Sequence, residues 1–451
     1  MNAPRNPSID NPPPPGRAPR ASLDTLDEVG HSRRRFLTGV GAMAGAVVAG
    51  HVVGVWGRPV TAAGAAVAAK GSAKAAGAKG RTVVFVELAG GNDAISTVVP
   101  HADPAYRQLR PTLAIDAPID LDGSVGLHPN LAKLAERYRA GQVAIVEGVG
   151  DPEGDLSHFA SLANWWSGEK GRAGTSGWLG RYLDETVGFD DPLAGVVIGP
   201  GPSPALVGER SFATSISDAS GLSPRAPAWL SAPDDLVEEW ARFGTSRADR
   251  SALLGQVRQA IALTGDARRD LGRMLTPSAT DDDALSAQAY GGSSVATSFD
   301  LAARLVTSAR PPKVVYLTNL GDFDTHQGQA QRHPTLMAEL DAGIDHLLGA
   351  VEAAGAADKV IVMTLSEFGR RARENGSGTD HGSGSAHLFI GARVEGGRYG
   401  QPTSLATLDS RGNLPVSVDF RSMYATALEG WLGTDAEPIL GKGFTAQKIF
   451  A

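Results

Sequence analysis

The 451-residue sequence contains no cysteine. Disulfides, thiolate metal ligands and thiol nucleophiles are therefore excluded, and any metal ion must be bound by carboxylate, imidazole, amide or hydroxyl groups. Aromatic residues are also scarce, at 6% of the chain, whereas 42% of the residues are hydrophobic and 20% are charged. This composition is typical of a globular protein, and the chain is long enough to bury a large core.

Positive charge is scarce beyond the first 80 residues. Residues 1–80 contain 10 Lys or Arg and 4 Asp or Glu, which leaves 32 basic and 45 acidic residues in 81–451. An acidic body disfavours nucleic acid or an anionic membrane surface as a partner and is compatible with cation binding. Beyond the N-terminal segment, no stretch approaches the roughly 18 apolar residues of a membrane span. We therefore expect no nucleic-acid partner and no stable membrane span in the mature form.

The N-terminal segment has the features of an export signal. Residues 1–31 are rich in proline without a sustained hydrophobic pattern, so we expect them to be disordered. The run SRRRFL at residues 32–37 precedes a weakly hydrophobic segment, then Ala-rich sequence and a flexible spacer up to residue 80. This pattern is similar to a twin-arginine signal, which implies passage through the twin-arginine translocase and a periplasmic or secreted protein. A membrane anchor that is never removed is the alternative.

Strands and helices alternate along residues 81–451. Continuous apolar strands separated by helices are typical of a mostly parallel, doubly wound α/β sheet with helices on both faces. We predict one such domain, with a helical insertion at about 205–295. The expected strands lie at about 82–88, 142–146, 195–198, 313–317 and 359–365, and the expected helices at about 129–140, 234–274, 295–308, 334–355 and 419–432.

Carboxylates and a histidine follow two of these strands. The strand at 82–88 ends in a Gly-Gly-Asn turn and Asp93, and the strand at 313–317 leads to Asp322 and His326. The carboxyl ends of parallel strands meet at one edge of a sheet, where ligands of open α/β sheets bind. A carboxylate and an imidazole on one short loop suit zinc, manganese or iron. The alternatives are that Asp93 caps its own turn and that the second pair belongs to a surface loop.

The strand at 359–365 leads into a longer polar segment. Glu367 follows this strand directly, where a buried carboxylate needs a cation or a hydrogen-bonding partner. A nearby arginine such as Arg370 is the purely structural choice of partner. The Gly-rich loop that follows permits close approach of the backbone to a ligand. Its candidate metal ligands are Asp380, His381 and His387.

Ser157 and His158 begin another expected helix. The serine hydroxyl at that position commonly caps backbone N–H groups. A helix N-terminus is also where an anion binds and where an activated hydroxyl can attack it. His158 is then placed to orient or protonate a ligand.

Together these motifs resemble the alkaline-phosphatase-like superfamily, which includes phosphatases, sulfatases and cofactor-independent phosphoglycerate mutases. The closer resemblance is to an exported bacterial family, domain of unknown function 1501, over nearly the whole mature chain. Its hallmarks correspond here to Gly90-Gly91-Asn92-Asp93, Ser157-His158-Phe159, Asp324-Thr325-His326, Ser366-Glu367-Phe368-Gly369-Arg370 and Thr379-Asp380-His381-Gly382.

The resemblance implies an alkaline-phosphatase-like fold and a role for each of these positions. Ser157 would be the nucleophile, and the oxygens of the transferred group would be bound by His158, Asn92 or Arg370. One or two divalent ions of zinc, manganese, iron or calcium would be bound by Asp93, Asp322, His326, Glu367 and His381. Asp380 and His387 would be further ligands or hydrogen-bond partners of the ligands.

The sequence departs from the superfamily pattern after its last catalytic strand. Superfamily phosphatases have Asp-His there, whereas this chain has Glu367-Phe368, and its Asp380-His381 pair lies 13 residues further on. Either Glu367 replaces the aspartate and His381 is the final histidine, or Asp380-His381 is the pair and His387 comes last. The position of Glu367 at the strand end favours the first assignment, which leaves the second metal position one imidazole short.

The resemblance therefore implies an exported, metal-dependent hydrolase of a small-molecule or polymer-borne phosphate or sulfate ester. Two alternatives remain open. One is a non-catalytic exported binding or assembly protein on the same fold, and the other is group transfer or isomerisation, as in the mutases.

Overall fold

The computed structural model describes residues 54–56, 80–169, 176–188, 191–211, 213–217, 242, 252–275 and 294–451. The run at 32–37 that predicts export, the spacer before residue 80 and much of the predicted insertion lie outside these residues. Within the described part of the chain, no helix is both long and apolar enough to cross a lipid bilayer.

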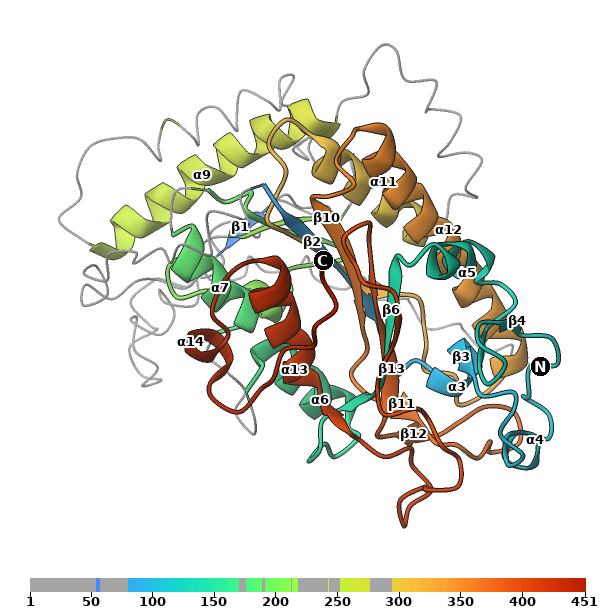
Figure 1. The fold of residues 1–451 in the computed structure, drawn as a ribbon. Helices are drawn as coiled ribbons and strands as arrows, with labels where there is room; N and C mark the ends of the chain where they lie inside the picture. Colours follow the sequence, from blue (N-terminus) through green and yellow to red (C-terminus); the bar gives the residue numbers. More distant parts are fainter. Residues whose placement is uncertain are drawn as a thin grey trace, which may run out of the picture. The chain divides into compact units, whose positions relative to one another are not determined.

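A ten-stranded sheet forms the centre of the fold (Figure 1). Its strand order is β1-β8-β7-β9-β2-β10-β13-β6-β14, with β15 beside β6. The strands are β1 (Gly54–Trp56), β2 (Thr82–Leu88), β6 (Val143–Gly150), β7 (Gly195–Ile198), β8 (Ala213–Ile216), β9 (Val314–Leu320), β10 (Val360–Leu365), β13 (Ser385–Ile390), β14 (Gly397–Gly400) and β15 (Val418–Asp419).

The predicted α/β class with a mostly parallel sheet is confirmed. Each neighbouring pair from β8 to β10 is parallel, and the five strands predicted from apolar runs are β2, β6, β7, β9 and β10. The sequence analysis did not identify β13, which runs antiparallel to β10 and to β6. No helix lies between β10 and β13, so the chain returns without the crossover that a parallel neighbour requires.

Helices cover both faces of the sheet (Figure 1). Successive residues of β2 explain why, because Val84 and Val86 belong to one hydrophobic core and Val83 and Phe85 to the other. The first core is covered by α5 (Ala132–Arg139), α9 (Ala252–Leu275), α11 (Ser294–Thr307) and α12 (Gln329–Ala353), and the second by α6 (His158–Ser167), α7 (Trp178–Thr186), α13 (Phe420–Ala425) and α14 (Glu437–Leu440).

Helix α12 begins earlier than its apolar spacing predicts. The sequence analysis began this helix at about Pro334, whereas the helix extends from Gln329 and contains this proline. The first turns are buried through polar side chains, Gln329 and His333, which an apolar pattern does not detect.

Short elements complete the described fold. A three-stranded sheet has the order β3-β5-β4, and β11 pairs with β12 in a two-stranded ribbon. These elements are α3 (Ala94–Thr97), β3 (Val98–Val99), α4 (Tyr106–Leu109), β4 (Ile119–Asp120), β5 (Gly126–Leu127), the 3₁₀ turn η2 (Pro204–Leu206), β11 (Gly369–Arg370), β12 (His381–Gly382) and the π-helical turn η4 (Thr426–Trp431).

Candidate metal centre

Loops from distant parts of the sequence meet at the carboxyl ends of β2, β9 and β10. These strands are neighbours in register, with Leu88 opposite Leu320 and Glu87 opposite Leu365, so their following loops emerge together. The beginning of α6 also contributes, because β6 ends at the same edge of the sheet. The predicted meeting of polar loops at one edge is therefore found in the structure.

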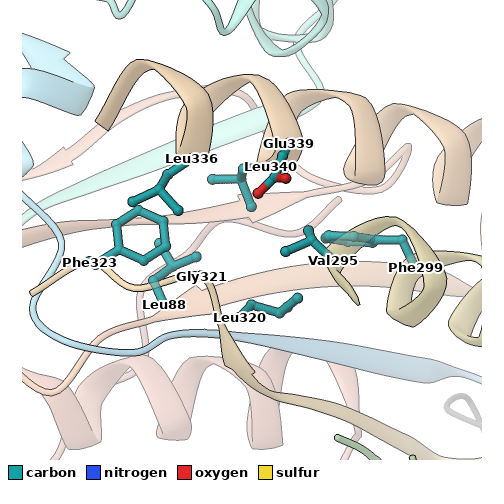
Figure 2. Close-up of a pocket in the computed structure, with 9 residues that line it drawn as sticks. All are labelled: Leu88, Val295, Phe299, Leu320, Gly321, Phe323, Leu336, Glu339 and Leu340. Atoms are coloured by element: carbon teal, nitrogen blue, oxygen red, sulfur yellow. The ribbon is translucent and has the colours of Figure 1, made fainter. Parts of the chain in front are cut away.

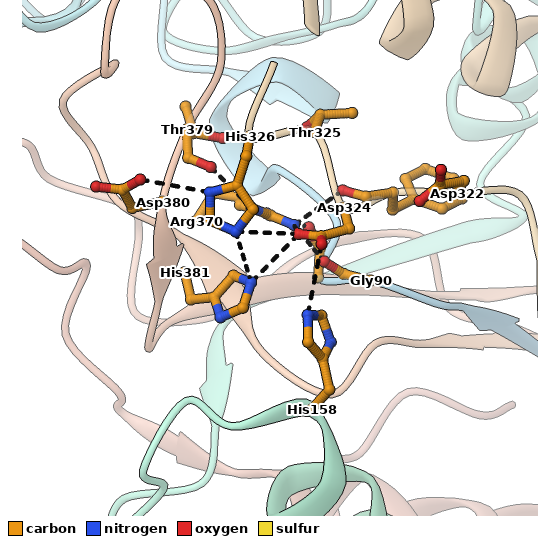
Figure 3. A network of polar contacts seen from close by, with 12 residues as sticks. Gly90, His158, Asp322, Asp324, Thr325, His326, Arg370, Thr379, Asp380 and His381 are labelled. Atoms are coloured by element: carbon orange, nitrogen blue, oxygen red, sulfur yellow. Dashed lines mark hydrogen bonds and ion pairs between the residues drawn. The ribbon is translucent and has the colours of Figure 1, made fainter. Parts of the chain in front are cut away.

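Three histidines surround the carboxylate of Asp324 (Figure 3). The Oδ1 atom of Asp324 lies 3.2 Å from Nε2 of His326 and 3.2 Å from Nε2 of His381. The Oδ2 atom lies 3.6 Å from Nε2 of His158. These four side chains are between 20% and 40% exposed, so the cluster is accessible from solvent.

The other nitrogen of each ring faces an oxygen. Nδ1 of His158 lies 2.9 Å from Oε1 of Glu367, and Nδ1 of His381 lies 2.9 Å from the carbonyl oxygen of Leu156. Nδ1 of His326 lies 3.4 Å from Oδ1 of Asp380. Both nitrogens of each ring therefore face oxygen acceptors, and the tautomer with the proton on Nδ1 is the one that leaves Nε2 free to bind a cation. In that tautomer the three Nε2 atoms and the Asp324 carboxylate form one set of electron-pair donors.

This donor set fits a divalent cation. Nε2 of His326 and Nε2 of His381 are 2.9 Å apart, close enough for both to bind one cation when both protons lie on Nδ1. Imidazole nitrogens with a carboxylate oxygen are common ligands of zinc, manganese and iron, and an outer partner on Nδ1 is the usual support of a metal-binding histidine. Asp324, His158 and His381 bring one such atom each to within 4.8 Å of one another.

Protonation in the cluster also favours metal binding. Burial lowers the pKa of His381, which keeps its imidazole neutral at pH 7. Burial acts to raise the pKa of Asp324, but the hydrogen bond and the charge of Arg370 outweigh it and hold this pKa below its usual value. The site thus combines a neutral imidazole with an ionised carboxylate, as metal ligation requires.

Arg370 holds the loops of the cluster together. Its guanidinium is fully buried and donates to the carbonyl oxygens of Gly91 at 2.8 Å, Thr379 at 2.7 Å and Phe323 at 3.1 Å, and also to that of Gly90. Nη2 lies 2.6 Å from Oδ1 of Asp324. Arg370, predicted to bind the transferred group, is instead occupied inside the protein, where it fixes the position of Asp324.

Glu367 contacts the cluster through the side of His158 that faces away from Asp324. Its buried Oε1 accepts hydrogen bonds from the backbone N–H of Gly90 at 2.9 Å and from Nδ1 of His158 at 2.9 Å. The sequence analysis made Glu367 a metal ligand. The structure places it behind His158, where it orients the imidazole, and Asp380 has the same relation to His326.

Asp93 lies in an interior ion pair. Its Oδ2 is 2.6 Å from Nη1 of Arg110 and its Oδ1 is 3.1 Å from Nη2, and both side chains are fully buried. Ser96 and Gln329 donate to the same carboxylate. Burial acts to raise the pKa of Asp93, but the charge and hydrogen bonds of Arg110 hold it well below its usual value. This carboxylate is therefore already neutralised by a buried arginine that the sequence analysis did not consider.

Asp322 lies outside the cluster as well. Its side chain is 77% exposed and pairs with Nη2 of Arg332 at 2.5 Å. The residue that reaches the histidines is Asp324, two positions before His326. Thr325 between them is fully buried, and the Asp324-Thr325-His326 hallmark was the sequence signal for this arrangement.

Ser157 lies beside the cluster without a hydrogen bond to it among the described contacts. It precedes α6 in an extended conformation, and its hydroxyl does not cap the helix. Its neighbours Leu156 and His158 both contact cluster residues. Leu156 has a φ of +63°, which is rare outside glycine, and its carbonyl oxygen accepts the hydrogen bond of His381.

His387 is fully buried elsewhere, on β13. Its ring packs against Trp165 at a centroid distance of 5.4 Å, and among the described residues neither ring nitrogen has a hydrogen-bond partner. The fourth predicted histidine is thus a core residue. Burial lowers its pKa to about 3, and also lowers that of the buried His128 and His333 to about 4 each.

The acid stability of the protein should depend on His387. Between its folded pKa and the usual value near 6.5, only the unfolded chain binds the proton, so the free energy of unfolding falls as the pH falls. A His387→Leu variant should lose one such contribution, about 1.4 kcal/mol per pH unit between about pH 6 and pH 4. Urea unfolding at several pH values measures this slope. An unchanged slope, or loss of bound metal in this variant, would contradict the position assigned to His387.

Glu87 is a buried acidic residue that the sequence analysis left without a role. Tyr316 Oη and Trp166 Nε1 donate to its Oε2 at 2.6 and 2.9 Å, and the Thr318 hydroxyl and Asn319 N–H donate to its Oε1 at 3.2 Å each. Burial raises its pKa. Trp166 and His158 lie on the same helix, so Glu87 and Glu367 together hold α6 against the sheet edge. The sequence signal that could have identified Glu87 is its position as the only acidic residue in an almost entirely apolar strand, near the strand's end.

A small pocket lies between the ends of β2 and β9 and helices α11 and α12 (Figure 2). Its lining is apolar apart from Glu339, so it offers no set of metal ligands. The lining residues are Leu88, Val295, Phe299, Leu320, Gly321, Phe323, Leu336, Glu339 and Leu340.

Fold and site together define an α/β protein with a candidate divalent-metal centre at the carboxyl edge of its sheet. The chain belongs to the family described as Protein of unknown function (DUF1501), whose model matches residues 144–443. The predicted family resemblance is thereby confirmed. A comparison with curated proteins found no similar sequence.

Several solved structures are similar to this chain at low identity. A protein in the alkaline phosphatase superfamily from Vibrio parahaemolyticus is 9% identical, with 92% of this chain and 78% of that chain covered and a TM-score of 0.36. The PsFucS1 sulfatase from Pseudoalteromonas sp. is 13% identical, with 79% and 68% covered and a TM-score of 0.35. The alkaline phosphatase from the Antarctic bacterium TAB5 is 12% identical, with 69% and 91% covered and a TM-score of 0.29.

Proposed function

We propose that the protein is a metal-dependent hydrolase of phosphate or sulfate esters, exported by the twin-arginine pathway. The observation that carries the proposal is the convergence of three imidazole Nε2 atoms on the ionised carboxylate of Asp324. The motifs of the sequence, which together resemble those of the superfamily that includes phosphatases and sulfatases, support the reaction class. The SRRRFL run at residues 32–37 supports the export route.

The residues of the cluster would hold the ion, and the ion would bind the ester oxygens of the substrate. Asp324, His158, His381 and His326 would be the ligands, and a divalent ion bound there would supply Lewis-acid stabilisation of charge on the ester oxygens. Glu367 and Asp380 would keep the Nδ1 protons in place, and Arg370 would keep Asp324 ionised.

Ser157 would supply the nucleophile. Its Oγ would attack the phosphorus or sulfur atom while the bond to the leaving oxygen breaks, and water would then hydrolyse the seryl ester. The serine proton would pass to solvent, and the leaving oxygen would take up a proton from solvent. The position of Ser157 supports this role, because it lies between Leu156, whose carbonyl oxygen contacts His381, and the cluster histidine His158.

Replacement of the nucleophile should separate turnover from metal binding. A Ser157→Ala variant should lose at least about a thousandfold in kcat, as expected for a covalent catalyst, while its metal content stays at that of the wild type. The assay is hydrolysis of 4-nitrophenyl phosphate and 4-nitrophenyl sulfate by chelator-free protein. Ser161→Ala, one turn further along α6, is the matched control and should retain activity.

A non-catalytic binding protein on the same fold is the second candidate. It is favoured by one observation: the buried Arg370 is fully occupied by protein oxygens, so it cannot hold the oxygens of a transferred group. Wild-type protein that binds metal stoichiometrically but hydrolyses neither ester would favour this candidate.

A further inference from the structure

Gln329 is a buried polar residue in contact with the loops that carry the candidate metal ligands. It is the first residue of α12 and is only 2% exposed. Its backbone N–H donates to the carbonyl oxygen of Ser377 at 3.0 Å. A glutamine amide has two donor hydrogens and an acceptor oxygen, so its burial costs free energy unless both ends find partners. The partners of this amide therefore indicate what the residue does.

The amide oxygen of Gln329 joins two of these loops. Its Oε1 accepts one hydrogen bond from the hydroxyl of Thr379 at 2.7 Å and another from the hydroxyl of Thr325 at 3.2 Å. Both threonines are fully buried. Among the described contacts, this oxygen is the only hydrogen-bond partner of either hydroxyl. The two hydroxyls thus depend on one amide, and the amide links their loops.

Each of these threonines lies next to candidate metal ligands (Figure 3). Thr325 lies between Asp324 and His326, and Thr379 lies two positions before His381. The backbones of the two loops are also in contact, because the N–H of Thr379 donates to the carbonyl oxygen of Thr325 at 3.1 Å. The Nε2 atoms of His326 and His381 are 2.9 Å apart, and this separation depends on how the two loops are held together.

Asp93 determines the direction of the amide. Its ionised carboxylate is paired with the buried guanidinium of Arg110 and also accepts a hydrogen bond from Nε2 of Gln329. An ionised carboxylate only accepts hydrogen bonds, so the NH₂ group must face Asp93 and Oε1 must face the threonines. A reversed amide would place two acceptors together at Asp93. The interior ion pair therefore orients Gln329 toward the two loops.

We propose that Gln329 is a positioning residue of the metal centre, which holds the loop of Asp324 and His326 against the loop of His381. The inference rests on the proposed function, because it concerns the same site, and it adds a residue that does not itself bind the ion. Residues that support metal ligands contribute about 10- to 100-fold to metal affinity. Gln329 contacts the neighbours of the ligands and not the ligands themselves, so its contribution should be about tenfold.

Cobalt binding to two methionine variants tests this role. Co²⁺ is added to the metal-free, full-length protein, and its visible absorption reports both the affinity and the arrangement of the ligands. Gln329→Met keeps the length of the side chain but removes the amide, so it should weaken binding about tenfold and change the absorption spectrum of the bound ion. Gln331→Met, at an exposed position of the same helix, is the matched control and should leave affinity and spectrum unchanged.

A mutant cycle separates positioning from general destabilisation. The double variant Thr325→Val, Thr379→Val preserves side-chain shape and removes the two hydroxyls that bond to Gln329. It should itself weaken Co²⁺ binding about tenfold, and addition of Gln329→Met should cause little further loss because the contact is already absent. Independent, additive losses would mean that Gln329 does not act through these loops. If Gln329→Met does not fold, wild-type affinity in the double valine variant overturns the inference.

The outcomes distinguish this inference from the proposed function. Wild-type affinity and spectrum in Gln329→Met overturn the role of Gln329 even if both 4-nitrophenyl esters are hydrolysed. Weaker binding and a changed spectrum in Gln329→Met, with Gln331→Met unaffected, support the role even if neither ester is turned over. Equal loss in Gln331→Met, or wild-type protein that binds no Co²⁺, also overturns the inference.

Discussion

Replacement of Asp324 by alanine should abolish metal binding, whereas replacement of Asp322 should leave it intact. Asp324 is the carboxylate on which the three Nε2 atoms converge, and without it the histidines lack their anionic partner. Loss of a residue that merely supports a metal ligand costs about 10- to 100-fold in affinity, so loss of Asp324 should cost more than about 100-fold. Elemental analysis by mass spectrometry of protein purified without chelator measures the bound ion.

Asp322→Ala is the matched control for this experiment. It removes the same chemical group two residues away, from a side chain that is 77% exposed and paired with Arg332. Equal metal loss in both variants would mean that the loop as a whole was disturbed. Metal loss in the Asp322 variant alone would overturn the cluster and restore the assignment made from the sequence.

Replacement of Asp93 by asparagine should destabilise the fold severely without emptying the metal centre. The substitution preserves shape but leaves the fully buried guanidinium of Arg110 without its counter-charge. Removal of one partner from a buried ion pair costs about 3–5 kcal/mol. Chemical denaturation measures the free energy of unfolding, and elemental analysis of the folded variant at low temperature measures its metal content.

The ion pair between Arg107 and Asp116 provides the comparison. Its N–O distance of 2.7 Å is close to that of the buried pair, but its side chains are 63% and 85% exposed. Asp116→Asn should therefore change the free energy of unfolding by no more than about 1 kcal/mol. If Asp93→Asn is as mild as Asp116→Asn and loses the metal ion, Asp93 is a ligand after all.

The sheet was predictable because a strand that is buried on both faces is a continuous run of apolar residues in the sequence. The run from Thr82 to Leu88 is almost entirely apolar, and the structure makes it a strand of that length. The edge strands and β13 were less visible, since β13 contains Ser385 and His387 among its buried residues. The spacing of apolar residues predicts helices and strands, but it does not predict which polar residues are buried in the core.

The site was predictable in its location and its histidines, but not in the choice of carboxylate. His158, His326 and His381 were all singled out from the sequence. Asp322 was preferred to Asp324 on spacing alone, although the direction of a loop side chain depends on the backbone turn around it. Partners distant in sequence, such as Arg110 for Asp93, decide which acidic residues remain available, and no local pattern contains them.

The contacts of Arg370 determine when a nascent chain can possess this centre. Its guanidinium joins carbonyl oxygens whose residues are separated from it by as many as 280 positions. Contacts of such long range form only after the intervening chain has been made and folded. When only the first three hundred residues have been synthesised, His158 is therefore the only one of the four cluster residues that is present. Any uptake of a metal ion by this centre would then follow translation of nearly the whole polypeptide, and a truncated product would lack the candidate ligands that come after His158.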